Sequence, residues 1–239
     1  MTVFGAPHRH HRVTDSTNAR LRELALAGAP GGTVVTAAEQ SAGRGRQGRS
    51  WFAPAGGALL YSALLRPLGR RPLLPLAVPL AVCEAAEGIA AVECEVKWPN
   101  DVWIAGRKVA GVLIESRAGE DGWGVIGVGL NVAIPQDAFP EELRQTAVGL
   151  FPSPGDGPGV AAVRAALDAA LGRWVDESPE RILRDFRARD ALEGMDVAWS
   201  DGEGVAAGVD DAGHLLVETP EGEVKLGAGE VHLQAPGRT

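Results

Sequence analysis

The sequence predicts a large domain of mixed strands and helices, residues 1–190, followed by a small antiparallel β-barrel, residues 191–239. Its 239 residues are enough for one domain with a sizeable core and a second, smaller one. Strand and helix patterns follow one another through the first part of the chain. From about Met195 the chain changes to short runs in which apolar and polar residues alternate, separated by Asp-Gly, Ala-Gly and Pro-Glu-Gly turns. This pattern is typical of small β-barrels.

Composition and charge exclude several classes of protein. The net charge of −8 disfavours general nucleic-acid binding, so any cationic cluster is a local site. No apolar run is long enough to span a membrane. The first residues lack the charged and apolar regions of a signal peptide, so we expect a cytoplasmic protein. Cys83 and Cys94 are isolated thiols in apolar surroundings, which predicts core residues and not a disulfide or metal pair.

The N-terminal segment holds histidines and then a cluster of polar residues. His8, His10 and His11 have the composition of metal ligands, but beside prolines and arginines at a terminus we expect a frayed, solvated start. Residues 15–18, Asp-Ser-Thr-Asn, are all of the N-capping type and precede a helical pattern that ends at Gly28. One cap uses fewer polar groups, so the remaining hydroxyls and amide are candidates to hold the polar head of a ligand.

The stretch around which the chain is organised is residues 40–51, delivered by a predicted strand at residues 33–38. It alternates three glycines with three arginines ahead of an aromatic residue: Gly43, Arg44, Gly45, Arg46, Gly48, Arg49 and Trp51. Glycine lets the backbone approach a ligand closely, and guanidinium groups match phosphate or carboxylate oxygens. Ordering about eight such residues costs on the order of 10 kcal/mol, so we expect a loop that is loose when empty and closes over a phosphate-bearing ligand.

Two phosphate-binding motifs match this loop by letter. The glycines satisfy the dinucleotide fingerprint, and residues 43–50 match a P-loop except that Arg49 replaces lysine. Both motifs need a helix directly after the loop, whereas Pro54, Gly56 and Gly57 follow here. Neither motif is therefore expected, and a solvated basic surface loop stays open as the alternative.

Several apolar elements look structural. Residues 58–65 predict a strand, and a helix is expected from about Leu76 to Ala90, with Pro79 tolerable only in its first turn. After a loop at residues 151–158, two amphipathic helices are predicted, the second of which begins at Ser178.

Residues 95–115 form a second stretch with candidate catalytic or binding residues. They predict a strand, a Pro-Asn-Asp corner and a hairpin that turns at Gly106. Lys97 and Lys108 flank the turn, and Asp101 can pair with a lysine or hold a metal. A surface ion pair is the alternative for each lysine. Period-2 alternation predicts one common face for Lys108, Ala110 and Val112.

A glycine-spaced strand is predicted at residues 123–132. Glycine weakens a strand unless a ligand or another backbone must come close. Gly127, Gly129 and Asn131 fall on one face, which predicts either the floor of a pocket or tight packing against a helix.

Taken together, five motifs stand in the order and spacing seen in biotin protein ligases, and the resemblance covers essentially the whole chain. The motifs are residues 15–18, 43–49, 97–101, 107–111 and 127–131. The resemblance implies an α+β catalytic domain, related to class II aminoacyl-tRNA synthetases and lipoate ligases, followed by an SH3-like β-barrel. Only 14 residues precede Asp15, which leaves no room for the DNA-binding helix-turn-helix of bifunctional relatives, so we expect a monofunctional ligase that binds no DNA.

The resemblance also implies a reaction and partners. Biotin and Mg-ATP give biotinyl-adenylate and pyrophosphate, and the biotin then passes to one lysine of a biotin carboxyl carrier domain. Mg²⁺ is expected to be held mainly by ATP phosphates and water, with no protein ligand named. We expect a monomer or weak homodimer and no membrane partner.

The residue roles carried over from the resemblance fall into three groups. The expected catalytic residues are Lys108, Arg44, Arg46, Lys97 and Asp101. The expected biotin-binding residues are Ser16, Thr17, Asn18, Gln40, Arg44, Gly45, Arg46, Lys108 and Gly111. The expected ATP-binding residues are Arg46, Arg49, Trp51, Asn100, Lys108 and Asn131.

Two other functions stay open. A lipoate or octanoate ligase or transferase of the same fold would be expected to have a pocket without the arginine-glycine loop. A non-enzymatic RNA-binding module would use the arginine loop and the small barrel, but it should show basic faces with exposed aromatic residues. The chain is acidic, and the barrel stretch has a single tryptophan, Trp199.

Overall fold

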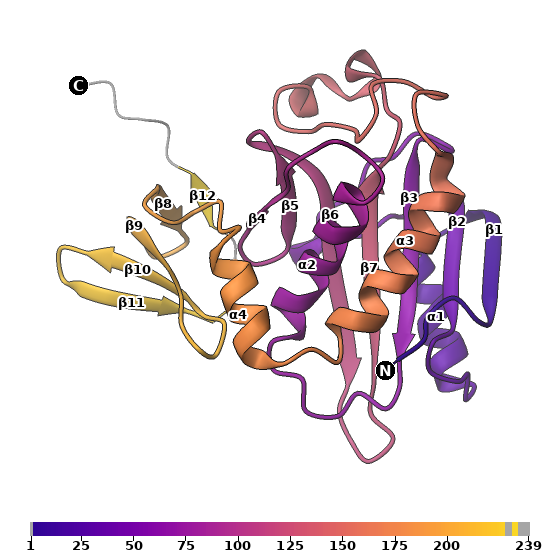
Figure 1. Cartoon of the computed structure of the whole chain (residues 1–239), viewed down its shortest axis with the longest axis horizontal. Coiled ribbons are helices and arrows are strands. Elements are labelled where there is room, and N and C mark those ends of the chain that lie inside the picture. The colour runs from indigo at the N-terminus through magenta and orange to yellow at the C-terminus, as the bar shows by residue number, and fades with distance from the viewer. Residues whose placement is uncertain (1, 228–230, 234–239) are drawn as a thin grey trace.

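A computed structural model describes residues 2–227 and 231–233, and these form a large sheet with helices and a smaller second sheet (Figure 1). The large sheet has the strand order β1-β2-β3-β7-β6-β5-β4 in the described residues. Its strands are β1 His8–Thr14, β2 Val34–Gln40, β3 Ala58–Leu65, β4 Glu95–Lys97, β5 Asp101–Ile104, β6 Arg107–Arg117 and β7 Trp123–Asn131. The helices are α1 Thr17–Leu26, α2 Leu74–Glu87, α3 Gly159–Trp174 and α4 Pro179–Arg187.

Helices cover both faces of the large sheet, as expected for an α+β domain. Strand β1 pairs with β2 in parallel, whereas the other described pairs of this sheet are antiparallel. Helices α2 and α3 pack on one face in the main core, and α1 packs on the opposite face against a smaller cluster that includes Val35, Leu64 and Val125 (Figure 1). The predicted strand at residues 58–65 is confirmed as β3, and every one of its residues is buried.

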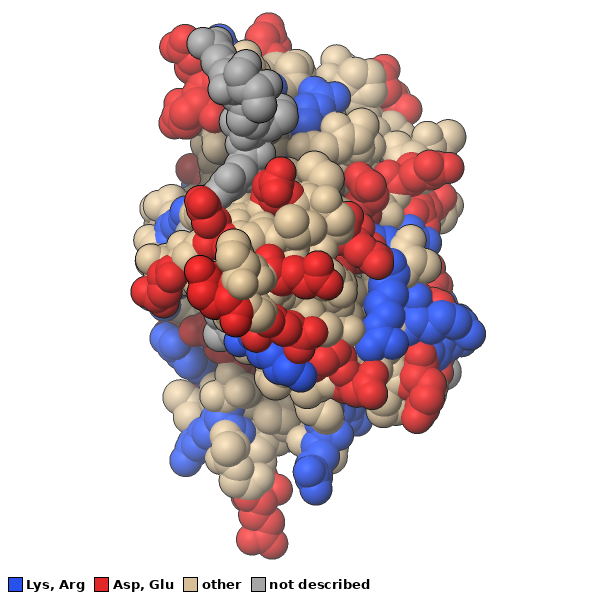
Figure 2. All heavy atoms as spheres, turned by 90° about the vertical axis from the view of Figure 1, so that its left-hand side faces the viewer, with Lys and Arg blue, Asp and Glu red and all other residues tan. Residues whose placement is uncertain are grey.

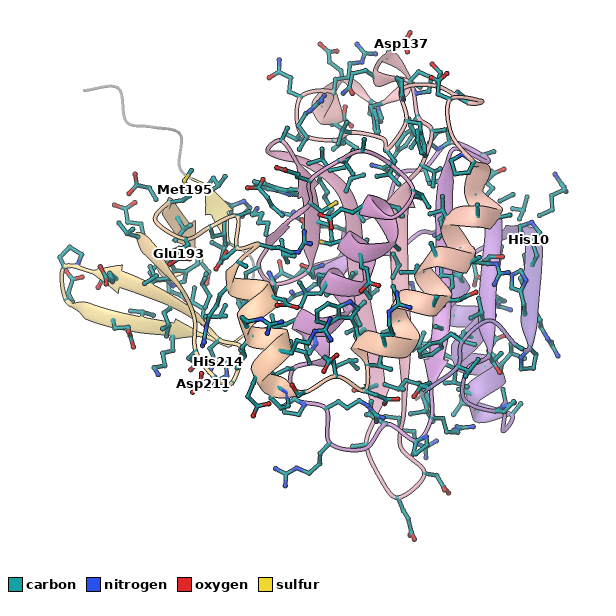
Figure 3. The ribbon with its side chains drawn as sticks, in the orientation of Figure 1. His10, Asp137, Glu193, Met195, Asp211 and His214 are labelled. Atoms are coloured by element: carbon teal, nitrogen blue, oxygen red, sulfur yellow. The ribbon has the colours of Figure 1, made fainter. Side chains whose placement is uncertain are left out.

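The N-terminal histidines are not frayed, which corrects the prediction from sequence. They belong to β1, an edge strand whose backbone pairs with β2. The imidazole nitrogens His8 Nε2 and His10 Nδ1 each lie 2.9 Å from Thr36 Oγ1, and Figure 3 shows His10 at this edge of the sheet. Polar side chains on an exposed edge also hinder pairing with other chains. In the described residues, no group of three or more His, Cys, Asp or Glu side chains could hold a metal ion.

Helix α2 also differs from the prediction. It starts two residues early, at Leu74, with Pro75 in its first turn, and Pro79 lies in its interior. An interior proline removes one backbone hydrogen bond and costs roughly 3 kcal/mol. Nearly all of this helix is buried against the sheet and α3, and the apolar burial offsets that cost. Cys83, on the same helix, and Cys94 are buried free thiols, as predicted.

The second sheet contains β8 Asp196–Trp199, β9 Gly202–Val209, β10 Leu215–Thr219, β11 Gly222–Leu226 and β12 His232–Leu233. Its strands pair antiparallel in the order β11-β10-β9-β8-β12, so the predicted barrel is an open sheet in the part of the chain that the structure describes. Residues 228–230 and 234–239 of the expected small domain lie outside the described residues. The sheet is joined to the large domain by the Trp98 indole N–H, which donates to the Gly213 carbonyl at 3.0 Å.

The two parts of the chain differ sharply in charge. Residues 1–192 contain 21 Lys and Arg and 21 Asp and Glu, whereas residues 193–239 contain 2 and 10 and so hold the entire net charge of −8. Figure 2 shows Asp and Glu side chains gathered over the side of the molecule that carries the second sheet. Within the described chain, no helix has the length and apolarity needed to cross a membrane.

Candidate active site

One cavity of about 600 Å³ gathers every site residue named from the sequence. This volume is in the range of small-molecule sites. The predicted residues that line it are Ser16, Thr17, Asn18, Gln40, Arg44, Gly45, Arg46, Arg49, Trp51, Lys97, Asn100, Asp101, Lys108, Gly111 and Asn131. Segments more than 100 residues apart in sequence therefore converge on one face of the large sheet.

Strand register explains part of this convergence. Lys97 on β4 pairs with Asp101 on β5, which pairs with Gly111 on β6, which in turn pairs with Gly129 on β7. Paired residues on neighbouring strands share a face. A row of two charged residues and two glycines therefore crosses the sheet beneath the cavity.

The glycines of this row make room for side chains that lie flat on the sheet. A Cβ at Gly129 would lie 2.4 Å from Trp51 Cε2, and a Cβ at Gly127 would lie 2.3 Å from Asn18 Oδ1. Any side chain at either position would collide with these groups. Both alternatives drawn from the sequence hold, because the glycine strand floors the cavity and also packs against Asn18 of α1.

Lys108 does not share a face with Ala110 and Val112, so the prediction from simple alternation is wrong. Val102 pairs with Ala110 but Trp103 pairs with Lys108, which leaves Val109 as an extra residue in β6. Such a β-bulge resets the alternation and re-aims the side chains before it. A Cβ at Gly111 would lie 3.2 Å from Lys108 Nζ, so the lysine faces the cavity together with Gly111.

The cavity cations have defined neighbours. Lys108 Nζ lies 2.7 Å from Asp101 Oδ1 and 5.6 Å from the centre of the Trp51 ring. Lys97 Nζ lies 5.2 Å from the centre of the Trp103 ring. Asp101 is the one acidic residue among the described residues that line the cavity. The arrangement can hold an anion beside Lys108, with a carboxylate in reach of the same point.

The arginine loop forms a small hairpin over the cavity. The backbone N–H of Gly45 donates to the Arg49 carbonyl at 2.7 Å, and that of Trp51 donates to the Gly43 carbonyl at 3.0 Å. Gln47 sits in the left-handed region with φ 52°, within a short 3₁₀ turn Arg46–Gly48. No α-helix follows directly, which confirms that the P-loop and dinucleotide motifs do not apply.

Asn100 and Asn131 orient groups at this end of the cavity. Arg46 Nη1 donates to Asn100 Oδ1 at 3.3 Å, and Asn100 Nδ2 donates to the Val112 carbonyl at 2.7 Å. Asn131 Nδ2 donates to the Val148 carbonyl at 3.1 Å. Asn131 Oδ1 and Trp51 Nε1 are buried without a hydrogen-bond partner among the described residues. Because both residues line the cavity, these two atoms are in position to bond to polar groups of a ligand.

The opposite end of the cavity is a closed polar cluster. Gln40 Oε1 accepts from the Thr17 backbone N–H at 2.7 Å and lies 3.0 Å from Thr17 Oγ1. Ser16 stands at the N-cap of α1 without capping it through its side chain. The predicted surplus of polar groups around this helix start is therefore real, and Ser16, Thr17 and Gln40 line the cavity.

Sequence reasoning missed residues behind and above the cavity. Ser62 bonds to both Thr17 and Asn18, and Glu115 bonds to Asn18. The one visible signal was a serine within the hydrophobic run of β3. Val231 and the two residues of β12 also line the cavity, and nothing local in the sequence pointed to them. Asn18 was expected to face the ligand, but both ends of its amide are bonded to protein groups.

Comparison with known proteins places this site in a family. The model described as Biotin/lipoate A/B protein ligase family matches residues 11–131, and the model of the Biotin protein ligase C terminal domain matches residues 202–233. The chain is 34% identical to the Biotin--[acetyl-CoA-carboxylase] ligase of Mycobacterium tuberculosis, over 92% of this chain and 87% of that protein. It is 35% identical to the bifunctional ligase/repressor BirA of Bacillus subtilis, over 97% of this chain and 75% of the relative.

A solved structure gives the same result. The biotin protein ligase of Aquifex aeolicus in complex with biotin and ATP superposes with a TM-score of 0.82 at 29% identity, over 97% of this chain and 100% of that chain. The fold and both family models therefore agree, and the chain belongs to the biotin protein ligases of the biotin/lipoate ligase family.

Proposed function

We propose that this chain is an ATP-dependent biotin ligase that activates biotin as biotinyl-5′-AMP and transfers it to a lysine of a biotin carboxyl carrier domain. One observation carries the proposal. The polar cluster around Thr17 and Gln40, which suits a urea ring, lines the same cavity as Lys108 and the arginine loop, which suit phosphates. The relatives with this function support the reaction class.

The first step joins two anions. An oxygen of the biotin carboxylate attacks the α-phosphorus of ATP, the bond to the β-phosphate breaks, and pyrophosphate leaves. Lys108 is proposed to bridge the carboxylate and the α-phosphate, and Arg44, Arg46 and Arg49 to close over the phosphates. Their cations offset the repulsion and stabilise the charge that develops in the transition state.

In the second step the amine of the carrier lysine attacks the acyl carbon, and AMP leaves. Asp101 is proposed to orient that amine or to take its proton, and Lys97 lines the same part of the cavity. The position of Asp101, 2.7 Å from Lys108 and on the cavity wall, supports a role at the reacting centre.

We also propose which residues bind the two substrates. Biotin is surrounded by Ser16, Thr17, Asn18, Gln40, Gly45 and Gly111. Trp51, Asn100 and Asn131 are proposed to hold the nucleotide, and the unpartnered atoms Trp51 Nε1 and Asn131 Oδ1 support this. Mg²⁺ would bind ATP phosphates and water. Asp101, the one carboxylate among the described residues that line the cavity, is already paired with Lys108, which fits this assignment better than a protein-held metal site.

Domain limits and location belong to the same proposal. The catalytic domain is proposed to span residues 1–190, and the terminal domain residues 191–239. The boundary is supported by its place between the end of α4 and the start of β8. The reaction is proposed to occur in the cytoplasm, where imaging of a fluorescent fusion would test it.

The test is pyrophosphate release by the purified protein with ATP and either biotin or lipoate, followed by mass spectrometry of a biotin carboxyl carrier domain. We expect release with biotin and a carrier mass increased by one biotinyl group. Release with lipoate alone would make the chain a lipoate ligase of the same fold. Release with neither acid would remove the proposed function.

A further inference from the structure

The indole of Trp98 joins the second sheet to the wall of the cavity. Trp98 lines the cavity and is only 2% exposed, and its Nε1–H donates to the carbonyl of Gly213 at 3.0 Å. Gly213 lies in the turn between β9 and β10 of the second sheet. A buried indole N–H needs a hydrogen-bond partner, so the position of the Trp98 ring depends on the position of this turn.

The turn between β9 and β10 is itself well fixed. The Gly213 backbone N–H donates to the Asp210 carbonyl at 3.0 Å, and the Asp210 carboxylate accepts from the His214 backbone N–H at 2.9 Å. Gly213 has φ 83°, a left-handed conformation that favours glycine. A Cβ at Gly213 would lie 3.2 Å from methyl carbons of Leu73 and Leu76, at the start of α2. The turn therefore packs closely against the large domain and presents its carbonyl at a defined place.

Trp98 lies between site residues that the two strands β4 and β5 carry. It follows Lys97 directly, and Asn100 and Asp101 come two and three residues later. Lys97 pairs with Asp101 across this corner, and Asp101 Oδ1 lies 2.7 Å from Lys108 Nζ. A displacement of the Trp98 ring would therefore shift both charged residues of the corner.

The residue on the other side of Lys97 is bonded to the segment that leads into the second sheet. The Val96 backbone N–H donates to the Arg189 carbonyl at 2.7 Å, and the Val96 carbonyl accepts from the Ala191 backbone N–H at 3.0 Å. This segment follows α4 and precedes β8. Lys97 thus stands between two residues whose positions are both tied to the C-terminal part of the chain.

We propose that Trp98 is a positioning residue whose hydrogen bond to Gly213 holds the corner with Lys97 and Asp101 in place for transfer of biotin to the carrier lysine. The proposal rests on the proposed function, in which Asp101 orients that amine or takes its proton. In the transfer step the lysine nitrogen bonds to the acyl carbon, the bond from that carbon to the AMP oxygen breaks, and the amine loses a proton. A small shift of the corner slows this step, because it depends on the distance between carboxylate and amine.

The experiment measures the single-turnover transfer of biotin from preformed biotinyl-5′-AMP to a biotin carboxyl carrier domain, which bypasses adenylation. Trp98→Phe keeps an aromatic ring and removes the donor to Gly213. Loss of one neutral hydrogen bond is expected to slow transfer about three- to tenfold. The KM for biotin, measured by pyrophosphate release, should stay at the wild-type value, because the corner does not hold biotin.

A matched control is Trp174→Phe. Trp174 on α3 is also buried, and its indole N–H donates to Glu84 Oε2 on α2 at 2.6 Å. Neither of these two residues lines the cavity. The substitution tests the general effect of removing a buried indole and its hydrogen bond. Transfer should stay at the wild-type rate, whatever the change in melting temperature.

A second pair of variants acts on the turn and leaves Trp98 intact. Gly213→Ala adds a Cβ against Leu73 and Leu76 and should slow transfer. Gly208→Ala is the control on β9, because its φ is also 83° but no heavy atom of the described residues lies within 4 Å of its added Cβ. It should keep the wild-type rate. The double variant of Trp98→Phe and Gly213→Ala should be no slower than Trp98→Phe, since both changes act on one hydrogen bond.

With an active wild type, three results overturn the positioning role alone. These are a wild-type transfer rate in Trp98→Phe, equal slowing of Trp98→Phe and Trp174→Phe, or equal rates in the two alanine variants. If Trp98→Phe does not fold, the comparison of Gly213→Ala with Gly208→Ala decides. A wild type that neither releases pyrophosphate with biotin nor transfers biotin from the adenylate removes the proposed function, and the positioning role with it.

Discussion

The two ends of the cavity are built in opposite ways. At one end Thr17 and Asn18 are 4% and 5% exposed and are tied to Gln40, Ser62 and Glu115 by hydrogen bonds. At the other end no residue of the Arg46–Gly48 turn is buried, and Arg46 reaches the body of the protein through a 3.3 Å bond to Asn100. The first end is fixed by the fold, and the second is a short hairpin laid over the surface.

This contrast suits the different tasks proposed for them. Recognition of a neutral polar ring depends on donors and acceptors that are already in place, because mobile ones would lose affinity to ordering. Three arginines form strong charge-assisted hydrogen bonds with phosphates, and these bonds can offset the entropy lost when the loop becomes ordered around the ligand. We therefore expect substitutions at the rigid end to change mainly the specificity for the acid, and substitutions at the loop end to change mainly the binding of phosphates.

The largest effect is expected at Lys108, whose side chain the β-bulge directs into the cavity, at the proposed reacting centre. Lys108→Ala should slow adenylation by about 10² to 10³, the usual loss for one preorganised donor, without unfolding the protein. Pyrophosphate release measures the rate, and circular dichroism measures the fold. Lys225→Ala, an exposed lysine on β11, is the control for charge removal. Near-normal turnover of Lys108→Ala would contradict the proposed role.

Two of the three glycines of β7 test whether the two ends of the cavity act separately. Gly127→Ala would push against Asn18 and should raise the KM for biotin, whereas Gly129→Ala would push against Trp51 and should raise the KM for ATP. Overpacking at such distances should change each constant by roughly tenfold or more.

Gly124→Ala is the control on the same strand, because its added Cβ meets only the end of the Leu68 side chain at 3.2 Å. Equal effects of Gly127→Ala and Gly129→Ala on both substrates would mean that the two ends do not act separately.

The predicted mobility of the arginine loop can be measured by amide hydrogen exchange. Residues 43–50 should exchange fast in the ligand-free protein and slow down when biotin and ATP are added. The helix start at Thr17 should change much less, because its hydrogen bonds are formed beforehand. Equal protection of the loop in both states would show that it is ordered without ligand.

The smallest effect on activity is expected at Asp190, which lies away from both ends between α4 and β8. Burial raises the pKa of this carboxyl to about 6 from an ordinary value of 3.8. Between these values the native state holds a proton that the unfolded chain has lost, so stability falls as the pH rises from about 4 to about 6. Above pH 6 the buried carboxylate lowers the free energy of unfolding by roughly 3 kcal/mol.

Asp190→Asn keeps an oxygen for the Leu192 backbone N–H and removes the charge, so its unfolding free energy should not fall across this window. Urea unfolding at pH 4.5 and pH 7.5 measures the difference from the wild type. Asp137→Asn, on an exposed loop (Figure 3), is the matched control and should follow the wild type. A parallel pH dependence of Asp190→Asn and wild type would contradict the assignment.

Most elements could be predicted from local patterns in the sequence, and the residues of the cavity could be named mainly from the resemblance to biotin protein ligases. The strand at residues 58–65 is a continuous apolar run, and glycines at 127 and 129 have few uses in a strand other than close approach. The predictions that were wrong or missing depended on contacts with residues distant in the sequence. The histidine strand β1 is held by β2, the face of Lys108 is set by a bulge against β5, and Ser62 gains its role only where α1 meets β3.

The uneven distribution of charge between the two parts of the chain has a consequence for handling the protein. A fragment that ended at residue 192 would carry equal numbers of cationic and anionic side chains and would sit near its isoelectric point in neutral buffer. Molecules without net charge attract one another more readily and precipitate. The acidic terminal sheet of Figure 2 thus provides the colloidal repulsion for the whole molecule, in addition to covering part of the core.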